Sequence, residues 1–173
     1  MVMMTEYYYR YHKTLICFIQ ITVKISGHEI VGKIIEVGGL VSDLCIGDVV
    51  GFGFLQTACY DCDWCFGGDE HLCNSKKTTC SRGGQGGFAN KFKGDSRACF
   101  KIPDGLDLKS VGPLMCAGIT VYSPLKKWSK PGCNVGVLGI GGLGHLAIKF
   151  AKAMGFTVTA FSRTSAKVEK YIT

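Results

Sequence analysis

The sequence predicts an α/β chain in two parts, an irregular β-rich region up to about residue 112 and a strand–helix–strand unit that begins at about residue 131. Three observations support this prediction. Short β-branched runs with glycine punctuation fill the first part, and a cluster of four cysteines interrupts it. A glycine turn followed by helical periodicity opens the second part. A chain of 173 residues suffices for one domain, or for a small domain and part of another.

The β-rich region is defined by short apolar runs that end in turn residues. Residues 28–53 predict two strands separated by glycine-rich turns, and residues 99–102 predict a further short strand. Residues 15–25 predict a buried strand. Gln20 and Thr22 interrupt this run and no small-residue cleavage site follows, which disfavours a signal peptide. The run is also too short to span a membrane.

The second part has the order of a βαβ unit. Residues 114–128 predict a helix, which Pro124 is expected to end or kink. Residues 135–138 and 156–161 predict two strands, and apolar positions recur at helical spacing over residues 143–154 between them. This is one strand–helix–strand unit, and a doubly wound sheet needs more strands than two.

Composition excludes several classes of protein. Hydrophobic residues make up 47% of the chain and charged residues 19%, as in a globular protein. The net charge is +7, but Lys and Arg are scattered and no run of five basic residues occurs, which disfavours nucleic acid as a partner. A small ligand that bears phosphate fits the basic balance equally well.

Four of the ten cysteines form a cluster with the spacing C-x2-C-x2-C-x7-C. Four thiolates this close can surround one tetrahedral zinc ion, and a closed shell of four protein ligands makes the site structural. An iron–sulfur cluster is the alternative, but its bacterial run ends in C-x3-C-P, whereas here the last interval is seven and Asn74 follows. Four unliganded thiols are a further alternative. Clustered thiols favour a reducing compartment, the cytoplasm. The predicted ligands are Cys59, Cys62, Cys65 and Cys73.

A glycine turn matches G-x-G-x-x-G and comprises Gly139, Ile140, Gly141, Gly142, Leu143 and Gly144. Alone the pattern is weak, but here it follows a predicted strand and opens a predicted helix, the context of a dinucleotide fingerprint. The glycines permit a tight turn, close approach of a pyrophosphate and close helix–strand packing. The helix N-terminus supplies free N–H groups for the phosphates. A generic glycine turn is the alternative interpretation.

The end of the second strand predicts the choice of cofactor. An NAD site would place Asp or Glu about 20 residues after the turn, but no carboxylate occurs there before Glu169. The residues in that place are hydroxyl-bearing or basic, which suits the 2′-phosphate of NADP: Ser162, Arg163, Ser165 and Lys167. They can also be the solvated start of a helix with Ser162 or Thr164 as N-cap, and both interpretations can hold together.

Gly27-His28-Glu29 places an imidazole beside a carboxylate. Imidazole is the commonest metal ligand, but a lone histidine is more often structural. Cys116 taken alone is equally typical of a small buried residue.

Together these residues resemble the zinc-dependent medium-chain alcohol dehydrogenases, and among them the cinnamyl-alcohol-dehydrogenase-like, NADP-dependent aldehyde reductase branch. The resemblance covers most of residues 27–167 and rests on seven motifs in the family's order: GHEIVGKIIEVG (27–38), GDVVGFG (47–53), the cysteine loop (59–73), GGFANKF (86–92), FKIPDGLDL (100–108), PLMCAGITVYSPLKKW (113–128) and VGVLGIGGLGHLAIKFAKAMG (135–155). It implies a GroES-like β domain over residues 27–130 and the start of a Rossmann-type dinucleotide-binding domain over 131–173, with 1–26 unassigned.

The resemblance also implies an activity and its residues. The family transfers a hydride reversibly between NADP(H) and an alcohol or aldehyde, with zinc as a Lewis acid on the oxygen. It implies that Thr120 lines the nicotinamide pocket, that the turn glycines bind the pyrophosphate and that the chain can form a homodimer. It implies catalytic-zinc ligands at His28, Glu29 and Cys116.

The sequence departs from the family pattern in its N-terminal segment and in its length. The family places its first zinc-binding cysteine in a C-G-x-C-H-[ST]-D segment, which residues 1–26 lack together with its proton-relay hydroxyl, and Cys17 is followed by Phe18. Residues 76–99 are shorter than usual, and the chain ends after one βαβ unit. The prediction is therefore a truncated family member with an incomplete catalytic-zinc site. A non-catalytic zinc-binding module, a basic zinc module on nucleic acid and a gene fragment without stable function stay open.

Overall fold

The structure is a computed structural model that describes residues 2–5, 25–81 and 84–163. It divides into two compact units, Met1–Met115 and Cys116–Thr173, which are treated separately below. The predicted strand over 15–25 lies outside the described residues except for its last residue, which is in a bend. The sequence-derived domain ranges, 27–130 and 131–173, place the helix before residue 130 in the first domain, whereas the compact division places it in the second unit.

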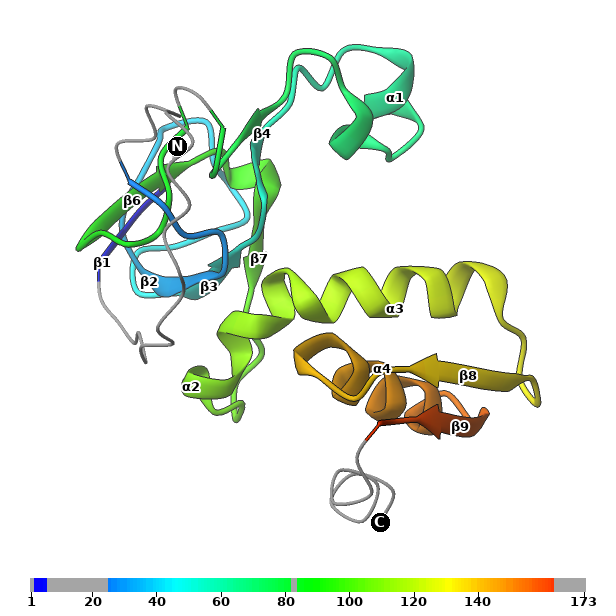
Figure 1. The fold of residues 1–173 in the computed structure, drawn as a ribbon. Helices are drawn as coiled ribbons and strands as arrows, with labels where there is room; N and C mark the ends of the chain where they lie inside the picture. The colour runs from blue at the N-terminus through cyan, green and yellow to red at the C-terminus, as the bar shows by residue number, and fades with distance from the viewer. Residues whose placement is uncertain (1, 6–24, 82–83, 164–173) are drawn as a thin grey trace. The chain divides into compact units, whose positions relative to one another are not determined.

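The first unit is built on a five-stranded antiparallel sheet in the order β6-β1-β2-β3-β7 (Figure 1). Its strands are β1 (Val2–Thr5), β2 (Ile30–Val37), β3 (Val49–Phe52), β6 (Lys91–Gly94) and β7 (Cys99–Lys101). The strands over residues 28–53 and 99–102 were predicted from the sequence. Strand β1 was not, and it fills the place between β2 and β6.

The core of this unit follows from the alternation along β2. Ile30 and Ile34 are buried while Lys33 between them is exposed, as a half-buried strand requires. The rings of Phe52 and Phe92 meet at 5.0 Å between centroids. The buried cluster comprises Ile30, Ile34, Leu44, Val50, Phe52, Phe92 and Ala98.

The cysteine loop leaves this unit through a small hairpin. Strands β4 (Leu55–Thr57) and β5 (Lys77–Thr78) pair in antiparallel fashion. The loop between them contains α1 (Asp63–Phe66) and the 3-10 helix η1 (Glu70–Leu72) (Figure 1). Three short helices complete the unit: η2 (Ser96–Ala98), α2 (Leu108–Val111) and η3 (Gly112–Met115).

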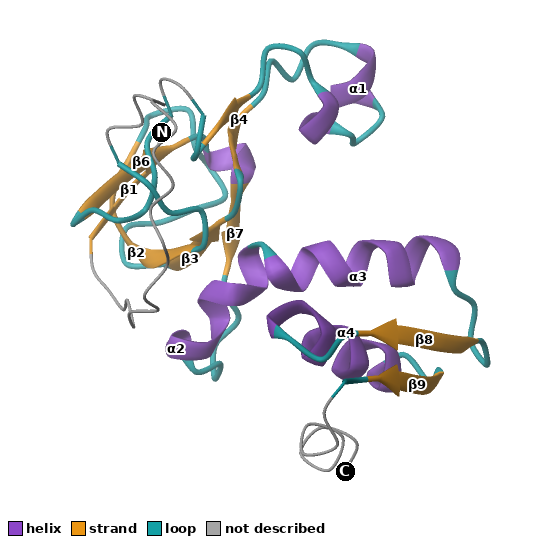
Figure 2. Ribbon diagram, in the orientation of Figure 1, coloured by secondary structure: helices purple, strands orange, loops and turns teal. Residues whose placement is uncertain are grey.

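The described part of the second unit contains α3 (Ala117–Trp128), β8 (Asn134–Leu138), α4 (Gly142–Ala153) and β9 (Thr157–Phe161) (Figure 2). Strands β8 and β9 are parallel, with α4 as their crossover, so the predicted strand–helix–strand order is confirmed. Helix α3 packs on α4 through Leu125 and Ala151 and through an edge-to-face contact of Tyr122 and Phe150 at 5.8 Å.

Helix α3 continues through Pro124 to Trp128, so of the two outcomes predicted for this proline, an end or a kink, the end does not occur. Proline removes one backbone donor and strains the helix. Packing offsets this cost, because Tyr122 before the proline and Leu125 after it both contact residues of the second unit.

The C-terminus of α4 is closed by a Schellman motif. The N–H of Phe156 donates to the carbonyl of Ala151, and the N–H of Gly155 donates to that of Lys152, both at 3.0 Å. Gly155, with φ +80°, therefore ends the helix. In the parts of the chain that the structure describes, no helix has the length and apolar character needed to cross a membrane.

Candidate functional site

The four clustered cysteines bring their sulfurs together at one point of the first unit. The Sγ of Cys59 lies 3.8 Å from that of Cys65 and 3.5 Å from that of Cys73, and Cys62 lies 3.6 Å from Cys65. All four sulfurs lie within 4.8 Å of one another. A tetrahedron of sulfurs at zinc–sulfur distances of about 2.3 Å has edges of about 3.8 Å. Both the donor set and its spacing therefore fit one zinc ion.

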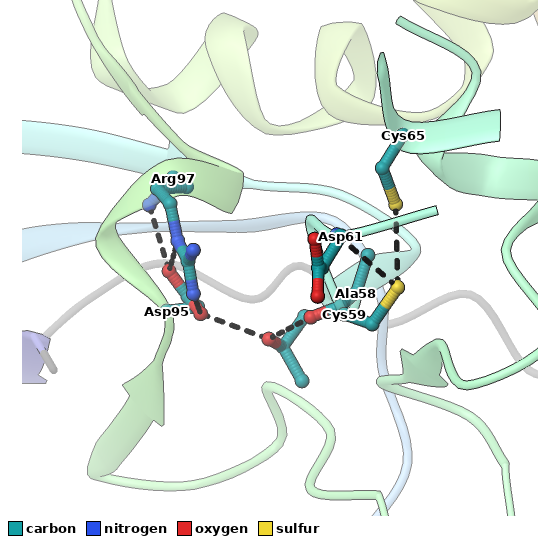
Figure 3. A network of polar contacts seen from close by, with 7 residues as sticks. Ala58, Cys59, Asp61, Cys65, Asp95 and Arg97 are labelled. Carbon is teal, nitrogen blue, oxygen red and sulfur yellow. Dashed lines mark hydrogen bonds and ion pairs between the residues drawn. The ribbon is translucent and has the colours of Figure 1, made fainter. Parts of the chain in front are cut away.

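The loop positions these sulfurs by local structure. Cys62 is the N-cap residue of α1, and its carbonyl accepts from the N–H of Phe66 at 2.9 Å, which places Cys65 on the buried side of the helix. Cys73 is buried at the end of η1. The N–H of Asp61 donates to the Cys59 sulfur at 3.4 Å (Figure 3).

Two of these thiols have pKa values shifted in opposite directions. Burial raises the pKa of Cys65 to about 12. The backbone N–H of Cys59 lowers the pKa of Cys73 to about 6. The loop alone therefore accommodates negative charge at Cys73 more readily than at Cys65.

A polar network joins the base of the loop to η2 (Figure 3). Asp95 accepts from Arg97 at 2.8 and 3.0 Å and from the hydroxyl of Thr57 at 2.9 Å. The hydrogen bonds from Arg97 lower the pKa of Asp95 to about 2. The guanidinium carbon of Arg97 lies 3.8 Å from the centroid of the Tyr60 ring. This network fixes the chain next to the first cysteine of the loop.

Tyr60 itself has an unusual conformation. Its φ is +57°, in the left-handed region that non-glycine residues rarely adopt. Its hydroxyl is buried and has no hydrogen-bond partner among the residues that the structure describes, and burial raises its pKa to about 12. The turn between the first two cysteines is therefore maintained by its surroundings rather than by local preference.

His28 and Glu29 follow a firmly held segment of the first unit. The N–H groups of residues 86–88 donate to the carbonyls of residues 25–27 in three hydrogen bonds of 2.8–3.1 Å. Gly27 has φ +101°, which only glycine adopts without strain, so this glycine allows the chain to turn into His28. Both predicted ligands are half-buried.

Cys116 is the N-cap residue of α3 and the first residue of the second unit. The first unit by itself therefore carries two of the three ligands that the family resemblance implies for a catalytic zinc. The complete set of His28, Glu29 and Cys116 remains a prediction.

The glycine turn of the second unit has the backbone that its motif requires. Gly139 has φ +88° directly after β8, and its N–H donates to the carbonyl of Phe161 at 2.9 Å, which links the turn to the end of β9. A Cβ on Gly144 would overlap the carbonyl oxygen of Gly139, so helix and strand approach closely only because residue 144 is glycine. Helix α4 begins at Gly142, with Gly141 as N-cap.

A cavity of about 1150 Å³ lies over this turn, within the second unit. A Cβ on Gly141 or Gly142 would meet no atom within 4 Å, so these residues leave open the space that a phosphate needs. The turn residues therefore fit a pyrophosphate. The predicted cofactor residues that line the cavity are Thr120, Gly139, Ile140, Gly141, Gly142, Leu143, Gly144, Ser162 and Arg163. The predicted residues Ser165 and Lys167 lie outside the described residues.

Three apolar side chains of the cavity were missed from the sequence. Trp128, Leu138 and Phe161 line it at the ends of α3, β8 and β9, and each is more than half exposed. For Leu138 and Phe161 the available signal was their position at the C-terminal ends of two parallel strands, since ligands of open α/β sheets bind there, whereas Trp128 ends a helix and had no such signal.

Comparison with known proteins determines the family. The model of the alcohol dehydrogenase GroES-like domain matches residues 5–104, more than half of the chain. The chain belongs to this family. Its first unit is therefore a GroES-like β domain, as the sequence predicts.

Similar curated proteins are cinnamyl alcohol dehydrogenases of plants. A probable cinnamyl alcohol dehydrogenase of Zea mays is 44% identical over 151 residues, which are 83% of this chain and 41% of the relative. Cinnamyl alcohol dehydrogenase 7 of Arabidopsis thaliana is 42% identical over 157 residues, which are 86% of this chain and 44% of that protein. The chain thus spans less than half the length of these relatives.

Solved structures show the same relationship. A cinnamyl alcohol dehydrogenase of Sorghum bicolor matches with a TM-score of 0.79 and 37% identity, over 84% of this chain and 44% of the other. The CAD protein of Helicobacter pylori, solved in complex with NADP(H), matches with a TM-score of 0.78 and 39% identity, over 86% of this chain and 45% of the other.

Proposed function

We propose that this chain carries two parts of an NADP(H)-dependent zinc alcohol dehydrogenase. One is the cysteine loop over residues 59–73, called the zinc lobe below, and the other is the glycine turn over residues 139–144, which binds the cofactor. Such an enzyme transfers a hydride between NADP(H) and a small alcohol or aldehyde. One observation carries the proposal: the glycine turn, Thr120 and Arg163 line a single cavity of the second unit. The NADP(H) complex of the Helicobacter pylori relative supports the same cofactor.

In this proposal the second unit forms the start of a Rossmann-type domain. The N–H groups at the start of α4 bind the pyrophosphate, since a helix N-terminus favours negative charge. Arg163 and Ser162 bind the 2′-phosphate, because a guanidinium and a hydroxyl both donate to phosphate oxygens. Thr120 contacts the nicotinamide.

Two zinc sites belong to the proposal. The four cysteines hold a structural ion, which stabilises a loop whose buried cluster is small. His28, Glu29 and Cys116 offer an imidazole, a carboxylate and a thiolate, a donor set that zinc accepts in catalytic sites. Zinc in such a site supplies Lewis-acid polarisation of the substrate oxygen. Thiols spaced for a metal also favour a reducing, cytoplasmic location.

A second candidate function is a non-catalytic zinc-binding module. The sulfur geometry favours it, because this site depends only on the first unit.

Titration with NADPH and NADH, followed by isothermal calorimetry, tests the proposal. We expect NADPH to bind at least about tenfold more tightly than NADH, because one charge-assisted phosphate contact distinguishes them. Gly142→Val should abolish NADPH binding by filling the cavity, whereas Gly39→Val, also in open space but in the first unit, should not. A chain that retains one zinc ion and binds neither nucleotide would instead support the zinc-binding module.

A further inference from the structure

The start of α4 has no side chain to cap it. Its N-cap residue is Gly141, which has no side chain with which to cap the free N–H groups of the first turn. Glycines at residues 139, 141, 142 and 144 give this turn great conformational freedom in the unbound state. A turn that must aim N–H groups at an anion therefore needs another group to fix it.

His145 contacts the turn at one atom. Its ring Nδ1 lies 3.0 Å from the carbonyl oxygen of Gly141, and its backbone N–H donates to the same oxygen at 3.1 Å. A carbonyl oxygen can only accept, so the Nδ1 atom carries the hydrogen in this arrangement. The Gly141 carbonyl is thus held by two donors from a single residue.

Because the peptide bond is planar, fixing the Gly141 carbonyl also fixes the direction of the Gly142 N–H, beside the cavity. The carbonyl of Gly141 and the N–H of Gly142 belong to one planar peptide unit, and in a trans peptide the two groups point in opposite directions. No cis peptide occurs among the residues that the structure describes. Because the carbonyl points toward His145 in the first turn, the Gly142 N–H points away from the helix body, and Gly142 lines the cavity.

We infer that His145 is a positioning residue for the pyrophosphate of the dinucleotide, an inference that rests on the proposed cofactor. Its Nδ1–H fixes the peptide between Gly141 and Gly142 before the ligand arrives. Gly142 then presents its N–H without first losing conformational entropy. His145 is absent from the cavity lining, so it acts through Gly141 and not by contact with the ligand.

Three substitutions separate this role from a general effect on the helix. His145→Asn places an amide N–H near the position of Nδ1 and should retain the bond. His145→Gln carries its amide one bond further out, and His145→Ala keeps only the backbone donor. We expect the alanine and glutamine variants to bind NADPH about fivefold more weakly, as the loss of one positioned hydrogen bond implies, and the asparagine variant to bind as the wild type does.

Two ligands measured by calorimetry on the full chain test the inference. NADPH contains the pyrophosphate, whereas adenosine 2′-monophosphate contains only the 2′-phosphate and should bind equally to all four proteins. The ¹⁵N spectrum of His145 should show hydrogen on Nδ1, and the melting temperature without ligand should be unchanged. The inference about His145 would be overturned if wild type and His145→Ala bound NADPH equally well, or if His145→Ala bound both ligands more weakly by the same factor. Either result would leave the proposed cofactor site standing. A wild-type chain that binds neither ligand would overturn the proposed cofactor site and this inference with it.

Discussion

The guanidinium of Arg97 stacks on the ring of Tyr60, with 3.8 Å between the guanidinium carbon and the ring centroid. Tyr60 lies between the first two cysteines of the zinc lobe, and Arg97 is also bound to Asp95 through two nitrogens. The zinc lobe is therefore anchored to η2 by a side chain that is distant from it in sequence.

Arg97→Ala should destabilise the first unit and accelerate zinc loss. It removes a cation–π contact and a two-nitrogen ion pair that is partly exposed, together about 1–2 kcal/mol. Arg97→Lys keeps the charge without the planar fork and should give an intermediate result. Urea unfolding and the rate of zinc transfer to a chelator measure both effects. Lys91→Ala, at an exposed position of β6, is the control. A wild-type zinc release rate for Arg97→Ala would contradict the anchoring role.

Asp95 predicts how stability depends on pH. Its pKa is about 2 in the folded protein, mainly because Arg97 donates to it, and about 3.9 in an unfolded chain. A lowered folded pKa stabilises the fold above pH 4, and this contribution is lost as the pH falls from about 4 through about 2. We expect about 1–2 kcal/mol, reduced by solvent around Arg97.

The measurement is the free energy of unfolding of wild type and Asp95→Asn between pH 2 and pH 7. The free energy of unfolding of the wild type minus that of Asp95→Asn should be constant above pH 5 and should shrink below pH 4. Asp104→Asn, at an exposed turn, should differ little from wild type throughout. A difference that grows as the pH falls would show that the sign is wrong.

Removing one sulfur should empty the zinc lobe. Cys62→Ser replaces one of four thiolates with a poor zinc ligand, and elemental analysis should show one zinc ion fewer per chain. Cys45→Ser changes an exposed thiol outside the cluster and should leave the zinc content unchanged. If both variants contain as much zinc as the wild type, the lobe is not the metal site.

Cofactor preference should depend on the residues after β9. Arg163→Ala should weaken NADPH binding roughly tenfold and leave NADH binding unchanged, because in the proposed site the guanidinium binds the 2′-phosphate that NADH lacks. Ser162→Asp should shift preference to NADH, since a carboxylate repels the 2′-phosphate and accepts from a ribose hydroxyl. Lys149→Ala, on α4 but outside the cavity lining, serves as the control. Parallel weakening of both cofactors by Arg163→Ala would assign it a different role.

Local motifs in the sequence predicted the local parts of both sites. The four cysteines lie in one loop, so their spacing alone nearly determines that the sulfurs meet. The glycine turn was equally predictable, because its backbone geometry depends on the residues of the turn itself. The bond between His145 and Gly141 was open to prediction as well, since residues four apart on a helix lie on one face.

Long-range relationships were not predictable. Strand β1 is recognisable only through its partners, because strand preference depends on the neighbouring strands. The stacking of Arg97 on Tyr60 joins segments that no short motif connects. The helix does not end at Pro124 because packing on both sides of the proline outweighs the strain that it introduces.

Because the four sulfurs lie so close together, the metal content of the cysteine loop depends on the treatments that the protein received earlier. Sulfurs 3.5–3.8 Å apart need to move less than 2 Å to reach the disulfide length of about 2.05 Å. In the proposed zinc site, oxygen can oxidise neighbouring thiols to a disulfide once the ion is removed, and reversing that step needs a reductant as well as zinc. Removal of zinc and its return then follow different chemical steps. The order in which chelator, oxidant and reductant are applied therefore determines whether the cysteines end as zinc ligands or as disulfides.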